Sequence, residues 1–310
     1  MDKPVKPKSV LVLFSYKSHK TGYYDTLFGP LKRREDEFGL HLEQGSLKDM
    51  IIEIIDNKLV ITESMTGKHL DQFDYVRFEM WQKSPQQALA VASYLDRKGI
   101  HFSGHGALHV LCSTKIGELA RMSDSRLPIP RTFMSSYSQT LKLFKSEQPP
   151  IPFPVVAKAA DTYGGMMNYL VKDYSELRTA LSAHKEQFFV IQEFIPNDCD
   201  YRFLVMGGQI KLIMKRTRQN ADTHLNNTTA GASGEFVDIH SLPASIKADA
   251  LKAAEKTLRS DFAGVDIMID KNTGKHYVLE VNEAPAIQSG EQPEIKEAAL
   301  LQHIKEMAYL

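Results

Sequence analysis

The sequence predicts a mixed α/β protein that is built from more than one subdomain. Residues 10–14 form a continuous apolar run, as expected of a strand buried on both faces of a parallel sheet. Short β-rich runs then alternate with helical stretches along most of the chain. A proline-dense stretch at 148–154 separates two such regions, because residues that precede proline disfavour helix.

The first third of the chain has the βα rhythm of an open sheet. Its further expected elements, in chain order, are two strands within 51–62, a strand at 75–78, and helices at 85–98 and 113–122. Asp56 and Asn57 favour a turn between the two strands within 51–62. Pro85 lies near the first turn of the first helix and Gly99 just past its end, which are the preferred places for these residues.

After the proline-dense connector, strands and helices alternate again. The expected strands lie at 155–159, 168–171, 188–192, 201–206, 210–214, 265–269 and 277–281, and the helices at 173–184, 245–258 and 294–310. Residues 219–234 are polar and have no periodicity, so we expect a long loop there. Loops of that length are usually functional or disordered.

Composition limits the classes of function. A chain of 310 residues with 43% apolar residues corresponds to roughly two domains. Lysine plus arginine equal aspartate plus glutamate at 38 each, which argues against a nucleic-acid or membrane partner. The two cysteines lack CxxC spacing, and the apolar run at 10–14 is too short for a signal sequence or a membrane span. We therefore expect a soluble, cytoplasmic protein.

Several common catalytic motifs are absent from the sequence. There is no GxxxxGK[ST] phosphate loop, no HExxH, no GxSxG and no kinase HRD or DFG triplet. The eleven histidines form no pair with the spacing of zinc ligands. The chemistry must therefore be sought in other residues.

The segment at 277–285 carries a candidate metal site. Residues two apart in a strand share a face, so Glu280 and Asn282 project together, while Leu279 and Val281 are expected on the opposite face. Asp266, across the predicted hairpin, falls within a residue or two of Glu280, although the sequence does not fix the register. Carboxylate and amide oxygens that point the same way suit Mg²⁺.

A lysine and a glycine-rich turn mark a candidate phosphate site. Lys158 alternates with apolar residues in a strand that should be buried, and a buried ammonium needs an anionic partner. Gly164 and Gly165 follow this strand, in a turn whose backbone N–H groups can cover phosphates. An ordinary hairpin turn is the alternative interpretation of the glycines.

The order of these segments resembles the ATP-grasp superfamily, and within it the RimK-type and D-alanine–D-alanine-ligase-type carboxylate–amine ligases. The resemblance covers about residues 100–290. It implies these roles: nucleotide contacts from Lys115, Lys158, Gly164, Gly165, Gln192, Glu193, Phe194, Ile195 and Asp200; catalytic contacts from Arg202, Arg216 and Asn226; metal binding by Asp266, Glu280 and Asn282.

The resemblance also implies the fold. It predicts an ATP-grasp protein with a Rossmann-like pre-ATP-grasp domain at 1–110, a central subdomain at 111–190, and a C-terminal subdomain at 191–310 that carries the metal site. One departure concerns the long loop. RimK-type enzymes carry Asn-x-x-Arg-Gly-Gly there, whereas Asn226 is followed by Thr229 at the arginine position.

The activity that the resemblance implies is ATP-dependent joining of a carboxylate to an amine through an acyl phosphate, with release of ADP and phosphate. The implied cofactors are ATP and Mg²⁺, with two ions expected and Mn²⁺ as an alternative. The implied partners are small-molecule or peptide substrates, and a homodimer is compatible with the family. A small-molecule kinase and a non-catalytic ATP-binding regulatory protein are alternatives. Arg77 is a candidate for either a substrate carboxylate contact or a structural ion pair.

Overall fold

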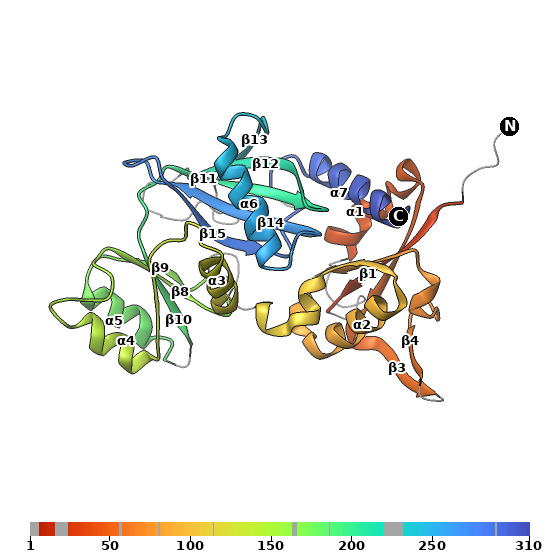
Figure 1. Cartoon of the computed structure of the whole chain (residues 1–310), viewed down its shortest axis with the longest axis horizontal. Helices are drawn as coiled ribbons and strands as arrows, with labels where there is room; N and C mark the ends of the chain where they lie inside the picture. Colours follow the sequence, from red (N-terminus) through yellow and green to blue (C-terminus); the bar gives the residue numbers. More distant parts are fainter. Residues whose placement is uncertain are drawn as a thin grey trace.

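The computed structural model describes residues 6–15, 24–55, 58–79, 81–113, 115–162, 166–185, 187–219, 232–288 and 290–310. Three sheets with their helices account for most of this part of the chain (Figure 1). The first sheet is parallel, and the other two are antiparallel.

The N-terminal sheet has the strand order β2-β1-β5-β6. Its strands are β1 (Lys8–Phe14), β2 (Leu40–Ser46), β5 (Tyr75–Glu79) and β6 (His101–Ser103). Helix α2 (Pro85–Lys98) packs its apolar side on one face of the sheet, against Leu11, Leu13 and Val76. The helix has the predicted bounds, and Gly99 ends it in the left-handed conformation at φ 66°.

The other face of the same sheet is covered by the end of the chain. Helix α7 (Pro293–Ala308) places Leu300 and Ile304 in one core with Val10 and Val12 of β1, beside the short helix α1 (Gly29–Lys32). Figure 1 shows α7 next to α1. The first strand and the last helix therefore share a core.

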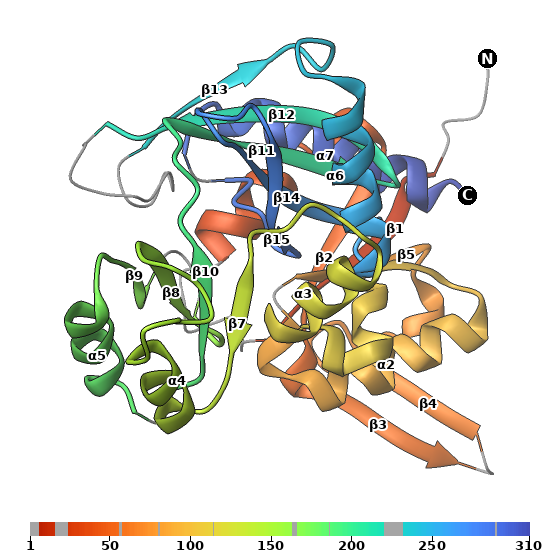
Figure 2. The same cartoon turned by 60° about the vertical axis from the view of Figure 1, so that its left-hand side comes forward.

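A hairpin extends from this domain. Strands β3 (Met50–Ile55) and β4 (Lys58–Glu63) pair antiparallel and project away from the parallel sheet (Figure 2). Both strands confirm the prediction for 51–62, and the turn residues Asp56 and Asn57 lie outside the described residues.

The central sheet has the order β7-β10-β8-β9. Its strands are β7 (Thr132–Met134), β8 (Val155–Ala159), β9 (Asn168–Val171) and β10 (Phe189–Glu193). Helices α4 (Tyr137–Phe144) and α5 (Tyr174–Ser182) share its core through Phe144 and Leu177. Strands β2, β6 and β7 and helix α4 were not predicted from the sequence.

The C-terminal sheet has the order β13-β12-β11-β14-β15. Its strands are β11 (Cys199–Met206), β12 (Gln209–Thr217), β13 (Ser233–Val237), β14 (Phe262–Ile269) and β15 (His276–Asn282). Helices α3 (Lys115–Asp124) and α6 (Ala244–Lys256) share the core on one face. The loop predicted at 219–234 ends earlier than expected, because β13 begins at Ser233, which pairs with Thr217 of β12.

No helix in the described part of the chain combines the length and the apolar character needed to cross a bilayer.

Candidate active site

The three residues predicted to bind metal come together at the pairing of β14 with β15. Asp266 lies directly opposite Glu280, and Gly264 lies opposite Asn282. The Asn282 side-chain amide donates to Glu280 Oε1 at 3.0 Å. The structure thereby supplies the register that the sequence left open.

A β-bulge beside Glu280 corrects one expectation. Asp266 pairs with Glu280 but Ile267 pairs with Val278, so Leu279 is an extra residue in β15. Val278 and Val281 both enter the core, whereas Leu279 is only partly buried. The expectation that Leu279 lies on the same face as Val281 was wrong, because the bulge breaks the two-residue alternation.

Two arginines and two aspartates form an alternating charge network on the same sheet. Arg202 on β11 donates to both oxygens of Asp266 at 2.7 Å. Arg216 on β12 donates to both oxygens of Asp200, at 2.6 and 2.8 Å, and lies 3.1 Å from Asp266. The Arg216 side chain is 3% exposed, and that of Arg202 is 18% exposed. Bidentate pairs of this kind fix planar geometry as well as charge.

The network gives its two carboxylates opposite pKa shifts. Burial alone would raise the pKa of Asp266, but the guanidinium groups of Arg202 and Arg216 hold it well below its usual value. Burial raises the pKa of Asp200, and Arg216 only partly opposes this effect. Asp266 is therefore the more strongly held anion of the two.

Lys158 reaches the site from the central sheet. Its ammonium group donates to Gln192 Oε1 at 2.9 Å, and the Gln192 amide donates to Thr132 at 3.0 Å. Burial lowers the pKa of Lys158, and the carboxylates of Glu280 and Asp266 oppose the shift. The lysine of one sheet therefore lies within the electrostatic field of the acidic pair on the other sheet.

Lys115, at the start of α3, faces the same region. Its Nζ donates to the carbonyl oxygens of Ala159, at 2.9 Å, and Thr162. Burial lowers the pKa of Lys115, and Glu280 is the first of the carboxylates that oppose this shift. The predicted loop residues Gly164 and Gly165, and the predicted catalytic Asn226, lie outside the described residues.

Residues 192–195, which were predicted to contact the nucleotide, form the end of β10 and the two residues after it. The Glu193 backbone N–H donates to Arg131 O at 3.0 Å, and the Phe194 N–H donates to Pro154 O at 3.4 Å. The Ile195 carbonyl accepts from the Asn197 amide at 2.8 Å. Several polar groups of this segment are therefore already bonded within the protein, and its contact with the nucleotide stays a prediction.

Arg77 makes the structural ion pair that was one of its two interpretations. Its guanidinium group donates to Glu79 at 2.6 Å and lies 3.9 Å from the centre of the Phe262 ring. Its side chain is 1% exposed, so Arg77 is buried between the N-terminal sheet and the start of β14.

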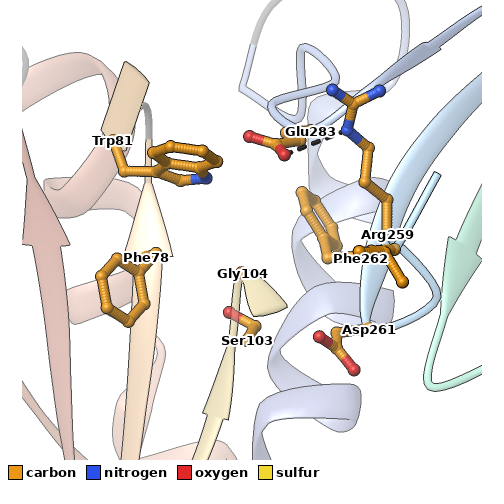
Figure 3. A pocket seen from close by; sticks show the side chains of 9 residues that line it. Phe78, Trp81, Ser103, Gly104, Arg259, Asp261, Phe262 and Glu283 are labelled. Atoms are coloured by element: carbon orange, nitrogen blue, oxygen red, sulfur yellow. Dashed lines mark hydrogen bonds and ion pairs between the residues drawn. The ribbon is translucent and has the colours of Figure 1, made fainter. Parts of the chain in front are cut away.

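Three charged residues that were not predicted from the sequence lie beside the site. Arg259 donates to Glu118 Oε2 at 2.6 Å and to Glu283 Oε1 at 3.0 Å. Figure 3 shows the Arg259–Glu283 pair at the edge of a small pocket that Trp81 and Phe262 also line. Burial raises the pKa of Glu118, and Arg259 opposes the shift. No sequence spacing links these residues, because Glu118 and Arg259 are 141 positions apart.

The donor set suits a divalent cation. Glu280 and Asp266 lie opposite each other across two strands, and the Asn282 amide nitrogen donates to Glu280 Oε1 at 3.0 Å and to Asp266 Oδ2 at 3.4 Å. Like charges placed directly opposite are unfavourable unless a cation lies nearby. Among the described residues no group of three or more His, Cys, Asp and Glu side chains could hold a metal ion. The predicted metal site differs from such a group, because it combines two carboxylates with the amide of Asn282. Oxygen ligands of this kind are those of Mg²⁺.

Comparison with known proteins gives the family. Residues 112–302 match the RimK-like ATP-grasp domain, which is more than half of the chain. The chain belongs to the RimK-like ATP-grasp family. A curated relative, the coenzyme gamma-F420-2:alpha-L-glutamate ligase of Methanocaldococcus jannaschii, is 25% identical over 221 residues, which cover 69% of this chain and 70% of the relative.

Solved structures share the ATP-grasp fold over nearly the whole chain. D-alanine–D-alanine ligase from Bacillus anthracis, solved with ATP, has a TM-score of 0.64 at 18% identity and covers 98% of this chain and 96% of its own. The ATP-grasp ligase PsnB, solved with a precursor variant, Mg and ADP, has a TM-score of 0.65 at 14% identity, with coverage of 96% and 99%. This RimK-like chain is thus an ATP-grasp carboxylate–amine ligase, as its motifs predicted.

Proposed function

We propose that this enzyme uses Mg²⁺-bound ATP to activate a carboxylate of a small molecule or peptide, and joins it to the amine of an amino acid. The observation that carries the proposal is the pairing of Asp266 with Glu280 beside Asn282, together with the bond from Lys115 to the carbonyl oxygen of Ala159, next to Lys158 on β8. The curated relative is named as a glutamate ligase, and the structural neighbour PsnB was solved with a precursor variant, which supports substrates of this kind.

The two lysines would bind the nucleotide. Each has a pKa lowered by burial, so an anionic ligand that replaces lost hydration would stabilise the charged ammonium. The Lys158 ammonium would exchange Gln192 for a phosphate oxygen, and the Lys115 ammonium would exchange the carbonyls of Ala159 and Thr162.

Asp266, Glu280 and Asn282 would hold the metal. When bound, Mg²⁺ supplies positive charge to the phosphate oxygens and helps to orient them for in-line transfer. Two ions, with Mn²⁺ as an alternative, remain our expectation.

Arg202 and Arg216 would have different roles. Arg202 is the more exposed guanidinium and would stabilise charge on the transferring phosphoryl group. Arg216 is nearly inaccessible between Asp200 and Asp266, so it would hold Asp266 in place. Asp200 would in turn orient Arg216.

The proposed reaction has two steps. A carboxylate oxygen attacks the γ-phosphorus, the bond to the β–γ bridging oxygen breaks, and ADP leaves. The amine nitrogen then attacks the acyl carbon, phosphate leaves with the C–O bond electrons, and the ammonium proton is lost to solvent. Because Thr229 replaces the arginine of the RimK-type motif, we expect an amine substrate that differs from that of the RimK type. A cytoplasmic location and a homodimer stay predictions.

Hydroxylamine trapping tests the proposal and separates it from a kinase. An enzyme that forms an acyl phosphate converts hydroxylamine and the right carboxylate to a hydroxamate, with one ADP and one phosphate for each product. A kinase that phosphorylates an alcohol would form ADP and a stable phosphate ester without free phosphate. ATP binding without any ADP formation across carboxylate and amine pools would favour the regulatory protein instead.

A further inference from the structure

The strand that carries Glu280 and Asn282 is the edge strand of its sheet, and its outer side is bonded to side chains. Val281, between these two residues, donates its N–H to Glu118 Oε1 at 2.6 Å. Its carbonyl oxygen accepts from Arg259 Nη1 at 2.7 Å. Glu118 and Arg259 also bind each other at 2.6 Å, so this pair takes the place of a sixth strand at this single residue.

Glu118 connects this strand to the helix that carries Lys115. The two residues are three apart on α3 and therefore lie on neighbouring positions of the helix surface. The carboxylate of Glu118 is 7% exposed and its partner Arg259 is 5% exposed, so solvent does not compete for these bonds. Glu118 thus fixes the position of β15 relative to α3, the helix that carries Lys115.

Arg259 extends the connection to the N-terminal domain. Its Nε donates to Glu283 Oε1 at 3.0 Å, and Gln82 donates to Glu283 Oε2. Gly106 passes so close that a Cβ at that position would lie 2.8 Å from Glu283 Oε1. Glu283 directly follows Asn282 in the chain, so the end of β15 is fixed on both of its sides.

We propose that Glu118 and Arg259 are positioning residues for the metal site. They hold the backbone between Glu280 and Asn282 at a fixed place relative to Lys115, so that the metal ligands and the phosphate-binding lysine act on the same nucleotide. The inference rests on the proposed function only in that ATP and Mg²⁺ bind at this site. Neither residue would touch the reacting atoms.

Binding measurements test the inference without any substrate. A non-hydrolysable ATP analogue is titrated calorimetrically into the full chain, once in excess Mg²⁺ and once in EDTA, and the ratio of the two Kd values measures the contribution of the metal. Glu118→Gln removes the charge that binds Arg259, and Arg259→Lys removes the planar fork that contacts Glu118 and Val281 together. Asp249→Asn is the matched control, because Asp249 binds His276 at the other end of β15 at 2.8 Å.

We expect each of the two test variants to weaken binding in Mg²⁺ by tenfold or more, while binding in EDTA changes less than twofold. The Kd ratio of the control should equal that of the native chain, even if its melting temperature falls. Native ratios in both test variants, or an equal loss of ratio in Asp249→Asn, would overturn the positioning role alone. A native chain that binds the analogue equally well with and without Mg²⁺ would overturn the metal site, and this inference with it.

Discussion

Asp266 lies directly opposite Glu280 on the β14–β15 pair, and their surroundings differ. Asp266 is held by the guanidinium groups of Arg202 and Arg216, whereas Glu280 accepts an amide N–H from Asn282. The Asn282 amide also donates to Asp266 Oδ2 at 3.4 Å, so it is bonded to both carboxylates. Glu280 also favours the charged forms of the buried ammonium groups of Lys115 and Lys158.

The first prediction concerns Glu280. Glu280→Ala should abolish the Mg²⁺-dependent rise in melting temperature that ATP causes, because the variant lacks one of the predicted metal ligands. Saturation at 100 times Kd stabilises the native chain by about 2.7 kcal/mol, which corresponds to several degrees. Differential scanning fluorimetry with ATP, in Mg²⁺ and in EDTA, measures the effect.

Glu235→Gln is the control for this variant, because Glu235 is an exposed carboxylate on β13 of the same sheet. It should keep the native response. A full Mg²⁺-dependent shift in Glu280→Ala would show that the metal binds elsewhere.

The second prediction concerns Lys158. Replacing it with Ala removes an ammonium that would bind phosphate, so the Kd for ATP should rise at least tenfold, or about 1.4 kcal/mol. Calorimetric titration gives this constant. Lys172→Ala, an exposed lysine just after β9, should bind ATP as the native chain does. An unchanged Kd in Lys158→Ala would move the phosphate site away from β8.

The third prediction concerns Arg216, which neutralises two buried carboxylates. Arg216→Ala leaves Asp200 and Asp266 buried without this partner, so the free energy of unfolding should fall by about 3 to 5 kcal/mol. Urea unfolding followed by circular dichroism measures it. The neighbouring Lys215→Ala breaks only an exposed pair with Glu235 and should cost about 1 kcal/mol or less. Equal losses in the two variants would contradict the buried network.

The fourth prediction is a pH dependence. Burial, with help from Arg77, lowers the pKa of His303 from 6.5 to about 4. The folded chain therefore keeps this histidine neutral while the unfolded chain binds a proton, and the resulting stability is present above pH 6.5 and lost as the pH falls toward 4. Between pH 7 and pH 5 this single group should remove about 2 kcal/mol from the free energy of unfolding.

His303→Gln should reduce that loss, as measured by urea unfolding at the two pH values. His240→Gln, which changes an exposed histidine, should leave the loss unaltered. A pH dependence that is the same in His303→Gln and in the native chain would mean that other groups are responsible.

The sequence predicted the elements that have strong end signals or strong periodicity. Helix α2 has the predicted bounds because Pro85 and Gly99 mark its two ends, and β9 was also predicted residue for residue. Strand β2 was not predicted because its polar end at Gln44 and Gly45 interrupts the apolar pattern. Strand β13 was not predicted because the Ser233–Gly234 sequence at its start is typical of a loop.

The site shows the same division between local and distant information. The residues Glu280 and Asn282 could be predicted because a strand places them on one face. The bulge at Leu279 could not be predicted, since it depends on how β15 pairs with β14. The link between Glu118 and Arg259 also could not, because no local pattern joins a helix residue to a residue 141 positions later.

The helix α7 has a consequence for how the chain is made. It covers the face of the parallel sheet that contains Val10 and Val12, yet its residues 293–308 are the last to leave the ribosome among those that build this core. During synthesis the first domain therefore carries an uncovered apolar face, which is a state that chaperones bind and that aggregates readily. The N-terminal domain of this ligase should complete its folding only after residues 293–308 have left the ribosome.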